Sequence, residues 1–140
     1  MKKTLQRGFT LIELLVVIAI IGILAAVVLA SLNDARDSGS DASAKTSMSN
    51  VRSQAEVFYN NNGFSYDDGT NEVCDDADVA ALFTAVDNVT GNTSVCANDA
   101  TSYGAEIALR NGDIFCIDST GFSGTVSAST ITADTDTVCD

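Results

Sequence analysis

The chain has 140 residues, with 19 acidic side chains against 7 basic ones, and it contains no histidine, proline or tryptophan. Its length fits one small domain. The absence of histidine excludes histidine-based catalytic triads and histidine-ligated zinc sites, since histidine is the commonest general base and zinc ligand. The glycine-rich patterns that hold phosphates, GxxxxGK[ST] and GxGxxG, are also missing. We therefore predict that the protein is not an enzyme.

Charge is distributed unevenly along the chain. The first eight residues carry three basic side chains and no acid, whereas the segment from residue 53 onward contains 15 acids and only Arg110 as a base. A surface of this sign repels nucleic acid and anionic lipid. We therefore expect no direct nucleic acid binding by this distal part.

An apolar segment, residues 9–30, is long enough to span a membrane. It contains a single charge, Glu13, and as a helix it would measure about 33 Å, close to the ~30 Å hydrocarbon layer. An ordinary secretory signal has a shorter apolar region, of about 7 to 15 residues. The basic residues before the segment predict a cytoplasmic N-terminus, which would send the rest of the chain outside.

Glu13 is the residue that a plain membrane anchor does not explain. An ionised carboxylate within a span costs roughly 2.5 to 3.5 kcal/mol on insertion scales, so it needs a partner. Snorkelling to the cytoplasmic interface is one alternative. The other is cleavage of the chain just before Phe9, which would create a new α-amino group that Glu13 of a neighbouring copy could neutralise.

The sequence around Glu13 resembles a known family signature. It reads Gly8-Phe9-Thr10-Leu11-Ile12-Glu13. This pattern is similar to the processing and assembly signature of type IV pilins and their pseudopilin relatives. The resemblance implies that residues 1–8 are a leader, that a prepilin peptidase cuts after Gly8 and methylates Phe9, and that Glu13 serves filament assembly by pairing with the N-terminus of an adjacent subunit.

The same resemblance implies partners and a location. Before assembly, the prepilin would be a single-pass protein of the cytoplasmic membrane, in contact with lipid, the prepilin peptidase and the inner-membrane assembly machinery. It would then join other copies of itself or other pilins in a helical filament, extracellular or periplasmic. A type II secretion pseudopilin or a minor pilin is an alternative. A different class is a membrane-anchored or secreted small binding domain, with calcium as a candidate ligand.

Residues 31–62 are predicted to continue the helix with an amphipathic face. Apolar residues recur there at helical spacing: Met48, Val51, Ala55 and Phe58. The segment 60–63, Asn-Asn-Asn-Gly, is a strong stop signal, and the Ser-Gly-Ser sequence at 38–40 is a weak joint. We expect a single helix from about Phe9 to Tyr59, with its first half in the membrane.

Residues 63–140 are predicted to form an acidic globular head. Between residues 64 and 100 only the segment 79–83 has a helical pattern, about two turns long, and the remainder is expected to be loop. Six acids fall between Asp67 and Asp78, but they do not fit an EF-hand loop. We expect no cofactor and no metal, and we interpret the acids as a solvated loop, with a non-EF calcium site as the alternative.

The clearest strand signal surrounds Asn111-Gly112, the preferred dipeptide of a two-residue type I′ hairpin turn. This turn predicts a register that places four apolar residues on the face covering the helix: Ile107, Leu109, Ile114 and Cys116. A third strand is expected within residues 124–132. The predicted fold class is α+β, with a long N-terminal helix packed on a small antiparallel β-meander with disulfide-closed loops.

Four cysteines allow three disulfide pairings and form no C-x-x-C motif. Chain order favours Cys74 with Cys96 and Cys116 with Cys139, because each bridge then closes a local loop. Bridges of this span stabilise a small domain by about 3 kcal/mol each on the chain-entropy model. The second pair would also resemble the disulfide-bounded C-terminal region of many type IV pilins.

Overall fold

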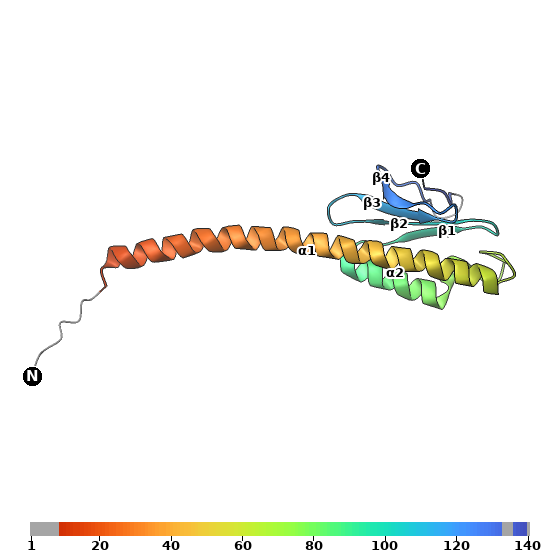
Figure 1. The fold of residues 1–140 in the computed structure, drawn as a ribbon, viewed down its shortest axis with the longest axis horizontal. Helices are drawn as coiled ribbons and strands as arrows, with labels where there is room; N and C mark the ends of the chain where they lie inside the picture. Colours follow the sequence, from red (N-terminus) through yellow and green to blue (C-terminus); the bar gives the residue numbers. More distant parts are fainter. Residues whose placement is uncertain (1–8, 133–135, 140) are drawn as a thin grey trace, which may run out of the picture. The chain divides into compact units, whose positions relative to one another are not determined.

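The computed structural model describes residues 9–132 and 136–139. Within these ranges it contains two α-helices, a short 3-10 helix and four strands (Figure 1). In chain order they are α1 (Leu11–Asn61), η1 (Val73–Asp75), α2 (Ala77–Thr90), β1 (Val95–Asn98), β2 (Tyr103–Ala108), β3 (Ile114–Asp118) and β4 (Ser123–Val126). The chain divides after Arg36 into two compact units, of which the second contains the whole sheet.

The predicted long helix is confirmed, because α1 is continuous over 51 residues. Neither Gly22, the glycine within the apolar segment, nor the joint at residues 38–40 interrupts it. Directly after the helix, Gly63 and Phe64 adopt left-handed backbone with φ of 66° and 65°, and the Phe64 N–H donates to the Tyr59 carbonyl at 2.9 Å. Two successive left-handed residues turn the chain away from the helix axis, at the predicted stop.

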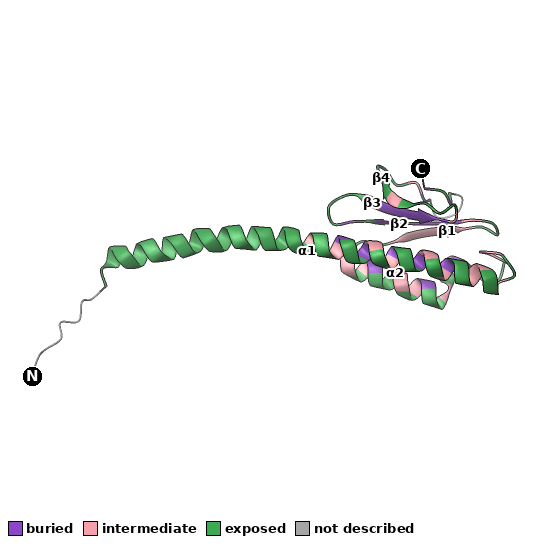
Figure 2. Ribbon diagram, in the orientation of Figure 1, coloured by how far each residue is buried: buried purple, intermediate pink, exposed green. Residues whose placement is uncertain are grey.

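The second half of α1 packs on the sheet along the predicted stripe. Met48, Val51 and Ala55 are almost fully buried, and Phe58 is partly buried against them. The core is completed from α2 and from one face of β2 and β3 by Val79, Phe83, Val86, Tyr103, Ala105, Ile107, Phe115 and Ile117. Figure 2 shows the buried residues on the central strands and on parts of both helices. Two helices therefore cover one face of one sheet.

The second helix is longer than predicted. α2 has 14 residues instead of about two turns, so the expected loop after residue 83 is wrong. Asp76 caps its start by accepting the N–H groups of Asp78 and Val79 at 3.0 and 3.2 Å, and left-handed Gly91 ends it. The later turns of α2 are rich in polar residues and give a weak pattern, but burial of Val86 against the core holds them in the helix.

The meander is confirmed, with strand order β1-β2-β3-β4 and every neighbouring pair antiparallel. The predicted hairpin register is wrong by one residue. Ile114 pairs with Ala108, whereas a two-residue turn would pair it with Leu109. Since side chains alternate along a strand, this difference places Ile114 and Cys116 on the face opposite Ile107.

The turn itself explains the changed register. The Gly112 N–H donates to the Leu109 carbonyl at 3.2 Å, and Gly112 has a φ of 93°. A type I′ turn would also need a positive φ at Asn111, which this residue does not have. Instead, the carboxylate of Asp41 on α1 accepts the N–H groups of Arg110 and Asn111 at 2.8 and 3.3 Å. A contact from the helix thus selects a three-residue loop.

Two strands differ from the prediction. β1 lies where loop is expected, because four residues are too short a pattern to recognise. β4 ends at Val126, so the third strand predicted within residues 124–132 is confirmed only in its first residues. The chain then crosses the outer face of the sheet. We call residues 127–132 and 136–139 the C-terminal strap.

Two buried carboxylates hold the C-terminal strap. Glu106 on β2 accepts the Ser129 hydroxyl and the N–H groups of Thr130 and Ile131, the latter two at 3.0 and 3.2 Å. Asp118 at the end of β3 accepts the Cys139 N–H at 3.0 Å. The outer face of the sheet therefore combines a small apolar cluster with charged groups that are satisfied by backbone donors.

Gly104 on β2 allows the strap to approach the sheet closely. A Cβ atom at this position would lie 2.7 Å from the Thr137 carbonyl oxygen and 2.5 Å from Cδ1 of Ile131. Backbone cannot yield as a flexible side chain does, so any larger residue would displace the strap.

Candidate functional site

The start of α1 brings two predicted site residues into a defined geometry. Glu13 accepts hydrogen bonds through Oε2 from the Thr10 backbone N–H at 2.9 Å and from the Thr10 hydroxyl at 2.6 Å. In return, the Glu13 N–H donates to Oγ1 of Thr10 at 3.3 Å. This is a capping box, in which Thr10 and Glu13 satisfy the free donors of the first helical turn reciprocally. Phe9 precedes the cap with an exposed side chain.

Thr10 is the functional residue that the sequence analysis misses. The signal is present in the sequence, since Thr10-x-x-Glu13 before an apolar run is the capping-box pattern. In a single copy, therefore, the Glu13 carboxylate is held by its own helix start. Gly8, the predicted cleavage residue, lies outside the described residues. The predicted roles of Gly8, Phe9 and Glu13 in processing and assembly stay predictions.

The apolar part of α1 is exposed throughout. Every large apolar side chain from Leu11 to Leu32 is between 45% and 74% exposed. An 18-residue window has a mean hydropathy of 3.1, which makes α1 the one described helix long and apolar enough to cross a membrane. An apolar surface of this extent needs a lipid or protein environment to cover it.

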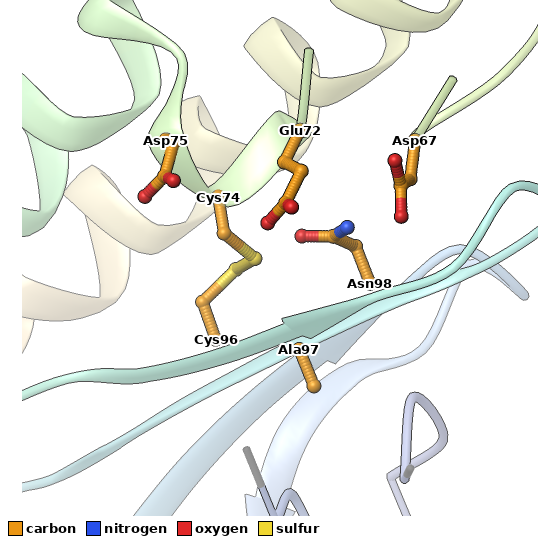
Figure 3. A pocket seen from close by; sticks show the side chains of 7 residues that line it. All are labelled: Asp67, Glu72, Cys74, Asp75, Cys96, Ala97 and Asn98. Atoms are coloured by element: carbon orange, nitrogen blue, oxygen red, sulfur yellow. A yellow bond between two sulfur atoms is a disulfide. The ribbon is translucent and has the colours of Figure 1, made fainter. Parts of the chain in front are cut away.

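The predicted acidic loop surrounds a hollow of about 340 Å³. Figure 3 shows the residues that line it: Asp67, Glu72, Cys74, Asp75, Cys96, Ala97 and Asn98. Across residues 9–132 and 136–139, no cluster of three or more Cys, Asp or Glu side chains has a metal-binding arrangement. The expected absence of a cofactor and the calcium alternative both stay untested.

The carboxylates of this loop serve its own backbone. Asp68 accepts the N–H groups of Thr70 and Asn71 at 2.9 and 2.8 Å, and Asp67 accepts the Gly69 N–H at 2.7 Å. The hydrogen bonds from Asn71, and then that from Thr70, hold the pKa of Asp68 below its ordinary value. Asp67 and Asp68 therefore stabilise the turn of their own loop.

Both predicted disulfides are present in the structure. Cys74 of η1 is joined to Cys96 of β1, and Cys116 of β3 is joined to Cys139 of the C-terminal strap. The first bridge ties the acidic loop to the edge of the sheet, and the second ties the strap to its centre. Chain order therefore predicts the pairing correctly.

The N-terminal segment is similar to segments of known proteins. Residues 3–29 match the model of the prokaryotic N-terminal methylation motif. The chain is 43% identical over 68 residues to the type IV major pilin protein PilE of Neisseria gonorrhoeae, in a match that covers 49% of this chain and 41% of the relative. It is 66% identical over 32 residues to the type IV major fimbrial protein FimA of Dichelobacter nodosus, covering 23% and 20%.

These matches confirm the resemblance predicted from the sequence. The described fold is α+β and pilin-like, with a long N-terminal helix, a four-stranded antiparallel meander and two disulfides. The N-terminal part of the chain is similar to that of the type IV pilins named above, and it matches the N-terminal methylation motif. It spans less than half the length of the curated relatives it matches. No solved structure shows a significant match.

Proposed function

We propose that this chain is a structural subunit, a prepilin, of a type IV pilus-like filament, assembled through the apolar half of α1. The observation that carries the proposal is the exposure of every large apolar side chain from Leu11 to Leu32 behind a capped carboxylate at Glu13. A membrane covers such a surface before assembly, and neighbouring subunits cover it afterwards. The relatives are named as pilus and fimbrial proteins, which supports a structural role without enzymatic activity.

The capping box explains how Glu13 serves both stages. In a lone subunit, the carboxylate takes its hydrogen bonds from Thr10, which lowers the cost of placing it near hydrocarbon. In the filament, it would exchange or extend these bonds to the methylated amino group of Phe9 of a neighbouring copy. Charge pairing in a medium of low dielectric is strong when both groups are desolvated together, so assembly would gain from a contact that the monomer lacks.

The expected partners follow from membrane insertion, cleavage and filament assembly. The prepilin would meet membrane lipid, the prepilin peptidase that cuts between Gly8 and Phe9, and the inner-membrane assembly machinery, and then other pilins. Its N-terminus would face the cytoplasm and its head the outside, because the three basic residues all precede the apolar segment. Major pilins, minor pilins and secretion pseudopilins all fit this description.

The test is the N-terminus of the mature protein together with its location. Mass spectrometry of protein sheared from cells should find a chain that starts at N-methylated Phe9. A mature chain that starts at Ser31 and is free in the medium would show a secreted domain, and one that retains Met1 in the membrane would show a plain anchor. Replacing Gly8 by a bulky residue should leave unprocessed protein in the membrane, as a control for cleavage at this bond.

A further inference from the structure

One flank of the second half of α1 carries two basic residues. Lys45 and Arg52 are seven positions apart, and therefore lie on the same helix face. Nζ of Lys45 is 5.8 Å from the centroid of the Phe115 ring on β3, and Nη1 of Arg52 donates to the Gly121 carbonyl at 3.2 Å. Phe122, which follows Gly121 in the chain, has a side chain that is 36% exposed. We call Lys45, Arg52 and Phe122 the basic flank.

Neither base of this flank has a carboxylate partner among the described residues. Among the described residues, the ion pair that forms joins Arg110 to Asp37 at 3.4 Å. Arg110 also donates to the Val89 carbonyl at 3.1 Å. Within residues 37–132 and 136–139, Lys45 and Arg52 are therefore the basic side chains that form no ion pair.

A different flank of α1 borders two hollows that are lined by acidic side chains and by Val57 and Phe58. Phe58 lies between two hollows of about 320 and 120 Å³, and Val57, which is 50% exposed, lines the smaller one. Four acids border these hollows: Glu72, Asp75, Asp76 and Asp78. We call this surface the acidic groove. It adjoins the hollow of Figure 3, with which it shares Glu72 and Asp75.

The two surfaces cannot meet within one copy. Phe58 follows Arg52 by six residues, and this spacing places the two side chains about 120° apart around the helix axis. The acidic groove and the basic flank therefore face different directions. Arg52 lies toward the β3–β4 turn, whereas Phe58 borders the start of α2. A contact between the basic flank of one copy and the acidic groove of another joins two different surfaces. When such a head-to-tail contact repeats with a rotation that does not close a ring, it forms an open helical assembly.

We infer that the acidic groove of each subunit receives the basic flank of a neighbouring copy in the filament. This inference rests on the proposed filament function and specifies which surfaces of neighbouring heads contact each other. Charge complementarity selects a second copy, because the groove offers four carboxylates and the basic flank presents two bases that have no carboxylate partner among the described residues. Val57 and Phe122 supply exposed apolar surface at the two sides of the contact. Complementary charge also offsets the repulsion between heads that are strongly acidic as a whole.

Charge reversal in the full chain, expressed as the sole copy, tests this contact. One variant reverses the acids (Asp75→Lys with Asp78→Lys), and a second reverses the bases (Lys45→Glu with Arg52→Glu). A third combines all four substitutions and restores the wild-type net charge. The matched control, Asp113→Lys with Asp136→Lys, changes the net charge as the first variant does but at exposed positions outside both surfaces. Asp76 is left intact because it caps α2.

The readout is processed subunit in the sheared filament fraction relative to the membrane fraction. Each reversal alone should lower this ratio by about tenfold or more, because like charges then oppose across the contact. The combined variant should recover most of the ratio, and the control should match wild type. Single reversals that assemble normally would overturn the inference, as would a combined variant that stays as defective as either reversal. Wild-type protein absent from sheared filaments would instead refute the proposed filament function itself.

Discussion

From Leu11 to Leu32, α1 exposes every large apolar side chain, whereas from Asp41 to Ala55 it buries a narrow stripe and exposes polar residues. The helical backbone is the same in both stretches. The first stretch has no partner element among the described residues, and the second lies on a sheet with α2 beside it. The second half of the helix thus builds a folded head, whereas the first half exposes an apolar surface that, under the proposed function, lipid or other subunits would cover.

The largest expected difference between the two halves is the response to a cavity. Met48→Ala should lower the free energy of unfolding of the head by about 2 to 5 kcal/mol, because Met48 is fully buried. Leu24→Ala, the matched control in the first half, removes a side chain that is 60% exposed and should leave head stability unchanged. Denaturant titration in detergent, followed by the near-ultraviolet circular dichroism of the tyrosines, would measure both. Equal effects would contradict the division of the helix.

The disulfides should stabilise the head without affecting the apolar half. Replacing Cys116 and Cys139 by serine should lower the free energy of unfolding by about 3 kcal/mol on the chain-entropy model, since the bridge closes a loop with a sequence separation of 23. Membrane insertion should stay at the wild-type level. Denaturant titration of the purified variant measures the loss of stability, and fractionation of cells measures membrane insertion. A loss of insertion would contradict the prediction.

A smaller effect is expected on acidification. Burial alone would raise the pKa of Asp118, but hydrogen bonds from Thr120, Cys139 and Phe122 outweigh it and hold the pKa below its ordinary value. A carboxylate with a depressed pKa adds stability above its unfolded-state pKa of about 3.9, and this stability is lost as the pH falls through the folded-state pKa. The free energy of unfolding should therefore fall as the pH is lowered below about 4.

Asp118→Asn tests the assignment of this acid effect. The variant should be less stable than wild type at neutral pH and should lose less stability between pH 7 and about pH 3. Asp136→Asn, in an exposed position of the C-terminal strap, is the control and should follow the wild-type curve. A wild-type pH dependence in Asp118→Asn would show that other carboxylates govern the acid response.

The sequence predicts the parts of this fold that rest on long or strongly periodic patterns. The 51-residue helix, its buried stripe and the disulfide pairing all follow from apolar spacing, a clear stop signal and chain order. The Asn111-Gly112 hairpin shows where such reasoning fails. The dipeptide marks the turn correctly, but the Asp41 carboxylate, about 70 residues earlier in the chain, fixes the loop length. Local preference cannot reveal a contact of that sequence separation.

The candidate site, in contrast, contains a local contact that the sequence could have revealed. The cap between Thr10 and Glu13 spans only three residues, and its pattern is visible in the sequence. The charge of Glu13 suggests a partner in another copy, whereas in the single chain the carboxylate already takes hydrogen bonds from its own helix turn. The acidic groove and the basic flank could not be predicted, because they depend on which face of α1 adjoins α2 and which adjoins β3 and the turn after it.

The proposed function requires that the first half of α1, through Glu13, drives assembly. The most direct measurement is the distribution of processed Glu13→Leu subunit, expressed as the sole copy, between the membrane and the sheared filament fraction. Leucine suits hydrocarbon better than a carboxylate does, so insertion and cleavage should persist. The filament fraction should fall by about tenfold or more, since the amine of Phe9 loses its counter-charge. Glu13→Leu subunits in sheared filaments at the wild-type level would contradict the account.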